Sequence, residues 1–342
     1  MAHQSILAHL APLFTNQIEN VATEALAHLL LEYPTVTVAF REYVSQAGSD
    51  LPASLKFSTQ ARGWQDAAIP DLVGLDGEGR YVLIVESKFW ANLTPNQPET
   101  YLKRMPAGVP AILLFIAPAS RLPTLWQELL DRSQPDQPTG QPQAAITPQF
   151  YTLQMNDRHI LALTAWESVL AALFRQAQQA GEEHACSDLW QLQSLCARID
   201  AEAFQPLSAG EMISPTEKRI NEFRGLVNDL VARLEASGII TTRGYHPATG
   251  PGYYRSYFSV RSTTNWCVEY NDEYRKMSPP ANLCLKFPVH PQFANIMEEF
   301  ADRGRRLSKQ FHIPLQIPTG VEKEAVLTSL VSQVEAVTEH LR

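Results

Sequence analysis

Three ionisable residues, Asp71, Glu86 and Lys88, lie in the otherwise apolar stretch Ile69–Trp90. Two strand-like segments in this stretch are joined by the turn-rich sequence DGEGR, which predicts an antiparallel hairpin. With the turn near Gly79, residues whose numbers sum to 157 face each other, so we expect Asp71 opposite Glu86. Lys88 follows Glu86 by two residues and therefore shares its face of the sheet.

This arrangement could hold a metal ion and support hydrolysis. Two facing carboxylates repel each other, which a purely structural hairpin would avoid. A divalent cation between Asp71 and Glu86 would remove the repulsion, and oxygen ligands suit Mg²⁺ or Mn²⁺. The backbone carbonyl of Ser87 could add a ligand. The alternative is a surface hairpin with a salt-bridged Lys88, which the neighbouring VLIV sequence disfavours because burying uncompensated charge costs several kcal/mol.

The motif carries a family resemblance. The PD of Pro70 and Asp71, with ESK beginning fifteen residues after the Asp, resembles the PD-(D/E)xK nuclease superfamily, which has the restriction-endonuclease-like fold. In that superfamily the motif Asp and Glu hold one or two magnesium ions, and the Lys orients or activates the attacking water. The resemblance implies that Asp71 and Glu86 are metal ligands and that Lys88 is the catalytic lysine. It covers about residues 15–175.

A second element follows the lysine. The sequence QPETY places Gln97 and Tyr101 four residues apart, on one face of a helix. It resembles the QxxxY element of many exonuclease-like and repair-associated members, where this element lies close to the active site. Two structural alternatives are open. Gln97 could form a capping box with Thr94, and Tyr101 could pack in the core.

The first helix offers an acidic residue, which many superfamily members use to complete the metal site. Residues 19–33 have a helical apolar period and contain Glu19 and Glu24 as candidates. At about 100° per residue, Glu19 lies at the margin of the apolar face and Glu24 points nearly opposite to it. We therefore expect Glu19 in the metal site and Glu24 in solvent.

The elements that would position these residues alternate between helix and strand. After the helix at 19–33, strands are expected at 55–64, 69–75, 81–90, 109–118 and 150–155, and helices at 94–105, 122–132, 159–178 and 188–204. Residues 133–149, rich in Pro and Gln, are expected to form a surface loop. This order predicts an α/β fold, a restriction-endonuclease-like core with a central mixed β-sheet flanked by helices.

The character of the sequence changes near residue 205, which predicts a nuclease-like domain at 1–205 and a C-terminal α+β domain at 206–342. A helix is expected from the N-cap Ser214 to the stop at Gly238. Aromatic-rich strands and closing helices follow. Cationic and aromatic residues alternate in this region and could contact phosphates and bases. The alternative is that the cations are solvated and the aromatics belong to the core. The residues are Arg255, Arg261, Trp266, Tyr270, Arg275 and Lys276.

Composition limits the class of protein. The 342 residues suit two domains, and 45% hydrophobic and 19% charged residues indicate a globular rather than a disordered chain. We expect a cytoplasmic protein without membrane partners, because no apolar run reaches the length of a membrane span and the N-terminus lacks signal-peptide features. The four cysteines show no metal-binding or disulfide pattern.

The net charge of −8 argues against a broad, non-specific nucleic-acid surface and leaves room for a local one. Residues 1–184 carry 11 basic and 18 acidic side chains, whereas residues 185–342 carry 17 and 18. The less acidic C-terminal half is therefore the expected source of phosphate contacts.

We expect a Mg²⁺- or Mn²⁺-dependent nuclease that hydrolyses phosphodiester bonds in DNA rather than RNA. Prokaryotic restriction or phage defence is a setting suggested by the family resemblance alone. The alternatives are an RNA-cleaving or nucleotide-activated nuclease, and a non-catalytic nuclease-fold protein for nucleic-acid binding or assembly, in which a metal ligand would be missing. The sequence leaves open whether the chain forms a homodimer.

Overall fold

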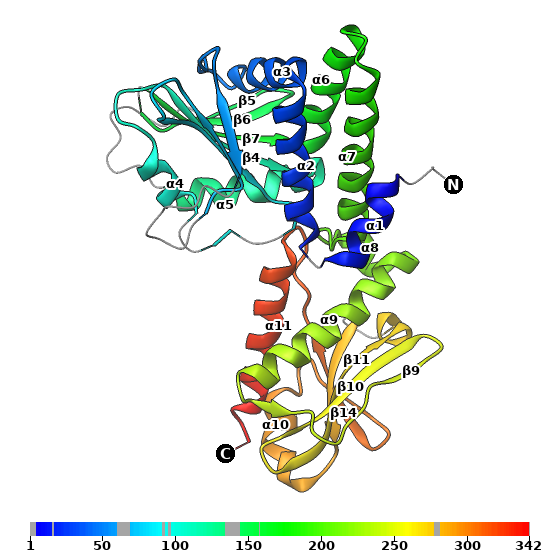
Figure 1. Ribbon diagram of the computed structural model, residues 1–342. Helices are drawn as coiled ribbons and strands as arrows, with labels where there is room; N and C mark the ends of the chain where they lie inside the picture. Colours follow the sequence, from blue (N-terminus) through cyan, green and yellow to red (C-terminus); the bar gives the residue numbers. More distant parts are fainter. Residues whose placement is uncertain are drawn as a thin grey trace. The chain divides into compact units, whose positions relative to one another are not determined.

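The computed structural model describes residues 5–15, 17–59, 69–90, 93–94, 97–133, 144–156, 158–276 and 281–341 (Figure 1). The chain divides into two compact units, Met1–Ala203 and Phe204–Arg342, called the N-terminal unit and the C-terminal unit below. Within the described residues, no helix combines the length and the apolar character that crossing a lipid bilayer requires.

The N-terminal unit is an α/β structure around a mixed sheet with the strand order β1-β2-β3-β4-β7-β6-β5. The strands are β1 (Lys56–Thr59), β2 (Leu72–Leu75), β3 (Tyr81–Ser87), β4 (Ala111–Ala117), β5 (Ala144–Ile146), β6 (Phe150–Gln154) and β7 (His159–Ala165). β3, β4 and β7 are parallel, and the other neighbours pair antiparallel. The predicted mixed sheet is confirmed.

Helices cover both faces of this sheet (Figure 1). The core on one face includes residues of α2 (Ile18–Glu32), α3 (Pro34–Ser45), α6 (Trp166–Gln179) and α7 (Glu183–Glu202), and α1 (Ile6–Phe14) packs on α7. The other face packs against α4 (Glu99–Arg104) and α5 (Leu122–Arg132), which follows a short 3-10 turn, η1 (Ala119–Arg121). Along β3, Leu83 and Val85 join the first core and Ile84 the second. Burial on both faces explains why the central strands are continuously apolar.

The β2–β3 hairpin has the predicted register. Leu72 pairs with Val85 and Gly74 with Leu83, so paired residue numbers sum to 157 up to a bulge before Leu75. The turn closes because Asp76 Oδ1 accepts the N–H groups of Glu78 and Arg80, both at 2.9 Å, and Gly79 has a φ of 77°. Such a φ favours glycine. The hairpin therefore brings Asp71 and Glu86 to the same end of the sheet.

Some predicted elements differ from the structure. The helix expected at 159–178 is wrong in its first part, because His159–Ala165 forms β7, buried between β4 and β6, and α6 begins at Trp166. An apolar run of this length fits a buried strand or a buried helix equally well by pattern. β5 lies inside the segment expected to be a loop. Residues 60–64 of the expected first strand lie outside the described residues.

The C-terminal unit is an α+β structure on an antiparallel sheet with the order β13-β14-β12-β11-β10-β8 and β9 paired with β10. Its strands are β8 (Ile240–Thr241), β9 (Ala248–Gly250), β10 (Tyr253–Val260), β11 (Thr263–Asn271), β12 (Leu283–Pro288), β13 (Arg305–Leu307) and β14 (Gln310–Leu315). Its helices are α8 (Ala209–Ile213), α9 (Glu217–Ala236), α10 (Ala294–Glu299) and α11 (Lys323–Thr338), with 3-10 turns η2 (Asp272–Lys276) and η3 (Pro291–Phe293). α9 and α11 cover one sheet face.

The start of α9 differs from the prediction. Thr216, not Ser214, is the N-cap, because its side chain accepts the Arg219 N–H, whereas Ser214 ends α8. The expected stop is confirmed at Gly238, which has a φ of 74°. β13 and β14 occupy part of the segment in which we expected only closing helices.

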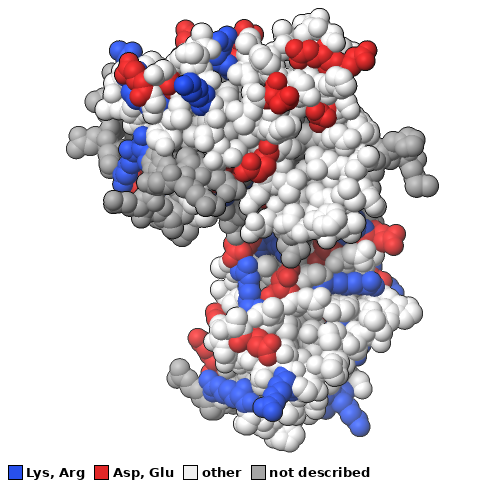
Figure 2. All heavy atoms as spheres, viewed as in Figure 1, with Lys and Arg blue, Asp and Glu red and all other residues white. Residues whose placement is uncertain are grey.

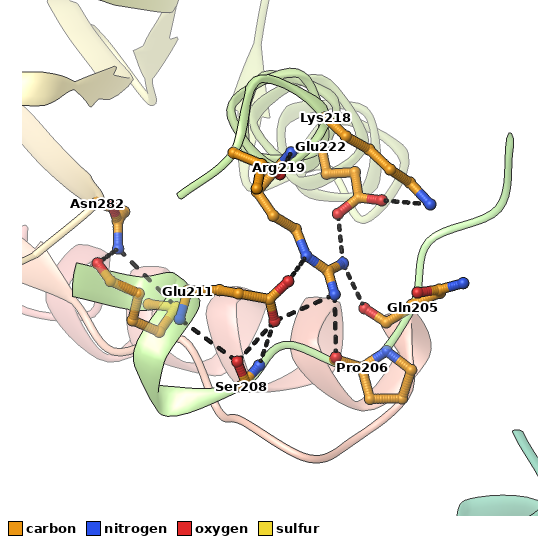
Figure 3. Close-up of polar contacts among 10 residues, drawn as sticks. Gln205, Pro206, Ser208, Glu211, Lys218, Arg219, Glu222 and Asn282 are labelled. Atoms are coloured by element: carbon orange, nitrogen blue, oxygen red, sulfur yellow. Dashed lines mark hydrogen bonds and ion pairs between the residues drawn. The ribbon is translucent and has the colours of Figure 1, made fainter. Parts of the chain in front are cut away.

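A buried arginine fixes the entry into the C-terminal unit (Figure 3). Arg219 Nη1 donates to the Gln205 carbonyl at 2.8 Å, and Arg219 Nη2 donates to the Pro206 carbonyl at 3.3 Å. Its guanidinium also pairs with Glu211 of α8 at 2.6 Å and with Glu222 of α9. One side chain thus ties the segment at 205–206 to both helices.

Candidate active site

The predicted site residues Glu86, Lys88, Gln97 and Tyr101 meet on one face of the N-terminal sheet. The helix expected at 94–105 is confirmed only over Glu99–Arg104, so Tyr101 lies in α4 and Gln97 precedes it. Glu86 follows Ile84 by two residues and so shares its face, which α4 and α5 cover. Glu86, Lys88, Gln97 and Tyr101 are at most 7% exposed, although three of them are polar or charged. Buried charges of this kind need partners, and the site provides several.

The Glu86 carboxylate is the centre of the network. Its Oε1 accepts from Gln97 Nε2 at 2.8 Å and lies 3.1 Å from Lys88 Nζ. Its Oε2 accepts from the Tyr101 hydroxyl at 3.0 Å. Gln97 Oε1 also accepts the Thr94 N–H at 3.1 Å, but Pro98 is the N-cap of α4 and no side chain among the described residues caps this helix, so the alternative of a capping box with Thr94 is wrong. Tyr101 is both a core residue and a partner of Glu86.

Asp71 lies beside Glu86, immediately before β2. Its Oδ2 accepts the Ser87 N–H at 2.8 Å. The register that pairs Leu72 with Val85 would bring Pro70 opposite Ser87. Proline has no N–H and cannot donate to the Ser87 carbonyl. The carbonyl oxygen of Ser87 is thereby kept out of the β2–β3 ladder and is available as a ligand.

The electrostatics of the pair fit a cation. The pKa of Asp71 is raised to about 7, first by burial and then by the negative charge of Glu86, while the Ser87 N–H and Lys88 act in the opposite direction. Burial and Glu86 also raise the pKa of Tyr101 well above its usual value. When both carboxyl groups are ionised, their two negative charges face the single positive charge of Lys88. Hard oxygen donors with excess negative charge suit Mg²⁺ or Mn²⁺.

Glu19 lies next to this group and binds the backbone after the lysine. Its Oε1 accepts the Trp90 N–H at 3.0 Å, and its charge contributes to the raised pKa of Asp71. Glu24 is exposed, as expected. Within the part of the chain that the structure describes, no three Asp, Glu, His or Cys side chains converge as a metal-binding group. Direct ligation by Glu19 therefore stays a prediction.

Sequence reasoning missed Arg121, which is fully buried. Lys88 donates its N–H to the Ile116 carbonyl at 2.9 Å, so the next rung of the β3–β4 ladder would need an N–H from residue 118. Pro118 has none, and Arg121 Nη1 donates to the Lys88 carbonyl at 3.3 Å instead. Its guanidinium also lies 5.8 Å from the centre of the Trp90 ring. In the sequence, only Pro118 indicated that the Lys88 carbonyl would need a donor from outside the ladder.

A cavity opens beside the carboxylates and was not predicted. Its volume is about 300 Å³, and it is lined by Gln17, Asn20, Thr23, Glu24, Ile69, Pro70 and Asp71. The first four come from the start of α2, and the others immediately precede β2. Asp71 therefore belongs both to the carboxylate group and to the wall of the cavity.

The cations and aromatics singled out in the C-terminal unit have structural partners. Arg255 pairs with Glu269 at 3.0 Å, Arg275 with Asp272 at 2.6 Å and Lys276 with Glu273 at 2.7 Å, and Arg261 donates to the Leu341 carbonyl at 2.8 Å. Trp266 and Tyr270 are buried core residues. Figure 2 shows Lys and Arg gathered at the lower end of this unit. Phosphate binding by this unit stays a proposal.

No family model, curated protein or solved structure matches this chain. Its function must therefore be inferred from the chemistry of the site. Two carboxylates, an ammonium group and a cavity at one sheet end can bind a hard cation and a phosphate beside it, and can position water between them.

Proposed function

We propose that this chain is a metal-dependent nuclease that hydrolyses phosphodiester bonds, with DNA as its substrate. The observation that supports it best is the buried pair of Asp71 and Glu86 with Lys88 Nζ 3.1 Å from Glu86. We also propose a restriction-endonuclease-like core. An antiparallel hairpin, the helix α4 and the parallel strand β4 follow one another in the order that the motif implies.

Asp71, Glu86 and the Ser87 carbonyl would hold Mg²⁺ or Mn²⁺, with Glu19 completing the site. When bound, such a cation polarises a phosphate and lowers the pKa of water. The residues of the chain supply the rest of the chemistry. Gln97 and Tyr101 hold the Glu86 carboxylate in place, and the raised pKa of Tyr101 keeps its hydroxyl a hydrogen-bond donor.

Lys88 would orient the attacking water and offset the negative charge that develops on the phosphate. Its backbone is held on both sides, because its N–H donates to Ile116 and its carbonyl accepts from Arg121. Glu19 fixes the following turn through Trp90. These contacts place the ammonium group without relying on the substrate, as a catalytic group requires.

The test is to incubate the purified full chain with linear, circular and single-stranded DNA and with RNA, in Mg²⁺, Mn²⁺ or EDTA. We expect cleavage of DNA in either metal and none in EDTA. Glu86→Gln should be inactive, and Glu78→Gln, an exposed change in the same hairpin, should be active. Equal cleavage in EDTA, or by Glu86→Gln, would contradict the proposal.

Two other outcomes would redirect the proposal. Cleavage of RNA alone would move the substrate class from DNA to RNA. Activity that appears only after a nucleotide is added would identify an activated nuclease. A restriction or phage-defence setting in a prokaryote is carried over from the superfamily and would then have to be tested in cells.

A further inference from the structure

The cavity beside Asp71 has the size of a site for one small organic group. Its volume of about 300 Å³ is at the lower end of small-molecule sites. A single base or nucleoside fits this volume. Because Asp71 lines the cavity, a group bound there would lie directly beside the proposed metal ligands.

The lining suits the edge and face of a base. Asn20 Nδ2 donates to Gln17 Oε1 at 3.3 Å, which holds the two side-chain amides together. Among the described residues, no hydrogen bond uses Gln17 Nε2 or Asn20 Oδ1, so a donor and an acceptor are available side by side. Ile69 and Pro70 add an apolar wall. Bases combine donors and acceptors at their edges with an apolar face.

Charge decides which part of a nucleotide enters. The Glu24 carboxylate is exposed at the cavity and would repel a phosphate. The uncharged base is therefore the favoured occupant, with its phosphate outside, toward the metal ligands. A base can enter such a cavity only when it is unstacked and unpaired.

We propose that this cavity binds one unpaired base next to the phosphate that is cleaved, and that the substrate is single-stranded or locally unpaired nucleic acid. This inference rests on the proposed nuclease function and adds the substrate class. The same nucleoside chemistry could be supplied by a free nucleotide, and the experiment below separates the two sources.

The experiment uses the full chain with Lys88→Ala, in Mn²⁺, so that bound substrate is not cleaved. A short single strand carries the fluorescent base 2-aminopurine at one position after another, and a duplex of the same sequence and free dAMP are the comparisons. We expect the single strand to bind more tightly than the duplex and dAMP, with one position whose fluorescence changes sharply. That position marks the base in the cavity.

A bulky substitution should then block the cavity. Asn20→Trp should lower single-strand affinity at least about tenfold, which is the scale of one lost base contact, while Mn²⁺ affinity and unfolding temperature stay unchanged. His28→Trp is the matched control, since His28 is exposed on the same helix but does not line the cavity. It should bind the strand as the parent does.

Failure of this inference can be told from failure of the nuclease proposal. If Asn20→Trp, in the otherwise unchanged chain, cleaves single strands and duplexes at the original rates, the cavity inference is overturned and the nuclease proposal stands. Tight binding of dAMP without binding of the strand also overturns it. If the unchanged chain cleaves no nucleic acid in any metal, both proposals fall together.

Discussion

Each unit of this protein buries a carboxylate–lysine pair on one face of its sheet, and the two pairs are compensated in opposite ways. In the N-terminal unit, Glu86 and Lys88 share their surroundings with a second carboxylate, Asp71. In the C-terminal unit, Glu269 pairs with Lys286 and with a second cation, Arg255. One group has excess negative charge and the other excess positive charge.

The hydrogen bonds of Glu269 and the pKa of Asp71 show the same difference between the two groups. Glu269 is fully buried, and it accepts from Arg255, Asn271 and Tyr274, each at 3.0 Å, as well as from Lys286. Burial acts to raise its pKa, but these partners outweigh burial and lower it. In the N-terminal group the pKa of Asp71 is raised. Removing a buried carboxylate whose partners are all supplied by the protein leaves buried cations unpaired, whereas an under-compensated carboxylate indicates a place for a ligand.

The largest effect is expected from removing the charge of Glu269, whose hydrogen-bond partners are all supplied by the protein. Glu269→Gln leaves Lys286 and Arg255 without their counter-charge, and we expect the unfolding free energy of the C-terminal unit to fall by about 3–5 kcal/mol. Amide hydrogen exchange of α9 under increasing urea measures it. Glu273→Gln, at an exposed ion pair in the same unit, should change little. An unchanged unfolding free energy in Glu269→Gln would contradict a structural role for the Glu269 carboxylate.

The same change at the two lysines should separate chemistry from stability. Lys88→Met should lower the cleavage rate by about 10²- to 10³-fold, because a group that stabilises developing charge is lost. Lys286→Met should leave the rate of the folded protein unchanged and lower the stability of the C-terminal unit. Initial cleavage rates and hydrogen exchange on the same preparations provide both readouts. Equal rates for Lys88→Met and the unchanged chain would refute the role of Lys88.

The C-terminal group should also respond to acid through His312. Burial, and after it the charge of Lys286, lowers the pKa of His312 to about 4 from an ordinary value of 6.5. The unfolded chain therefore binds a proton near pH 6.5, whereas the folded chain does so only near pH 4. Neutral His312 therefore does not weaken the fold above about pH 6.5. As the pH falls from 6.5 toward 4, the unfolding free energy decreases by up to about 3 kcal/mol, because the unfolded chain takes up the proton first. His312→Asn should flatten this part of the curve of unfolding free energy against pH.

The smallest expected effect is a gain in stability. In metal-free buffer, Asp71→Asn removes one of two repelling carboxylates, so the unfolding free energy of the N-terminal unit should hold or rise by about 1 kcal/mol. Added Mn²⁺ should stabilise the original chain and not the variant. Thermal unfolding in EDTA and in Mn²⁺ tests both statements. A clear loss of stability in EDTA would mean that Asp71 is structural.

The parts of the fold set by local chemistry could be predicted from the sequence. The turn around Gly79 predicted the register of the hairpin, and charges among apolar neighbours drew attention to Asp71, Glu86 and Lys88, which lie together in the structure. β7 was missed because a run that is buried on both faces has no periodicity to distinguish strand from helix.

Contacts between distant segments could not be predicted in the same way. The bond from Arg121 to the Lys88 carbonyl depends on which residue of β4 lies beside Lys88, and that is known only once the strands are paired. The ion pair of Arg275 could have been predicted from the sequence, because Asp272 precedes Arg275 by three residues. The cavity joins the start of α2 to Ile69–Asp71, and no pattern in either segment indicates the other.

The bond from the Ser87 amide to Asp71 Oδ2 gives this site its own spectroscopic probe. An amide proton held by a carboxylate resonates at a frequency that depends on the charge of that carboxylate. A cation that draws on the Asp71 oxygens would withdraw electron density from the bond, whereas a ligand elsewhere would leave it alone. The Ser87 amide signal in a two-dimensional ¹H–¹⁵N spectrum can therefore follow occupancy of the site without any substrate.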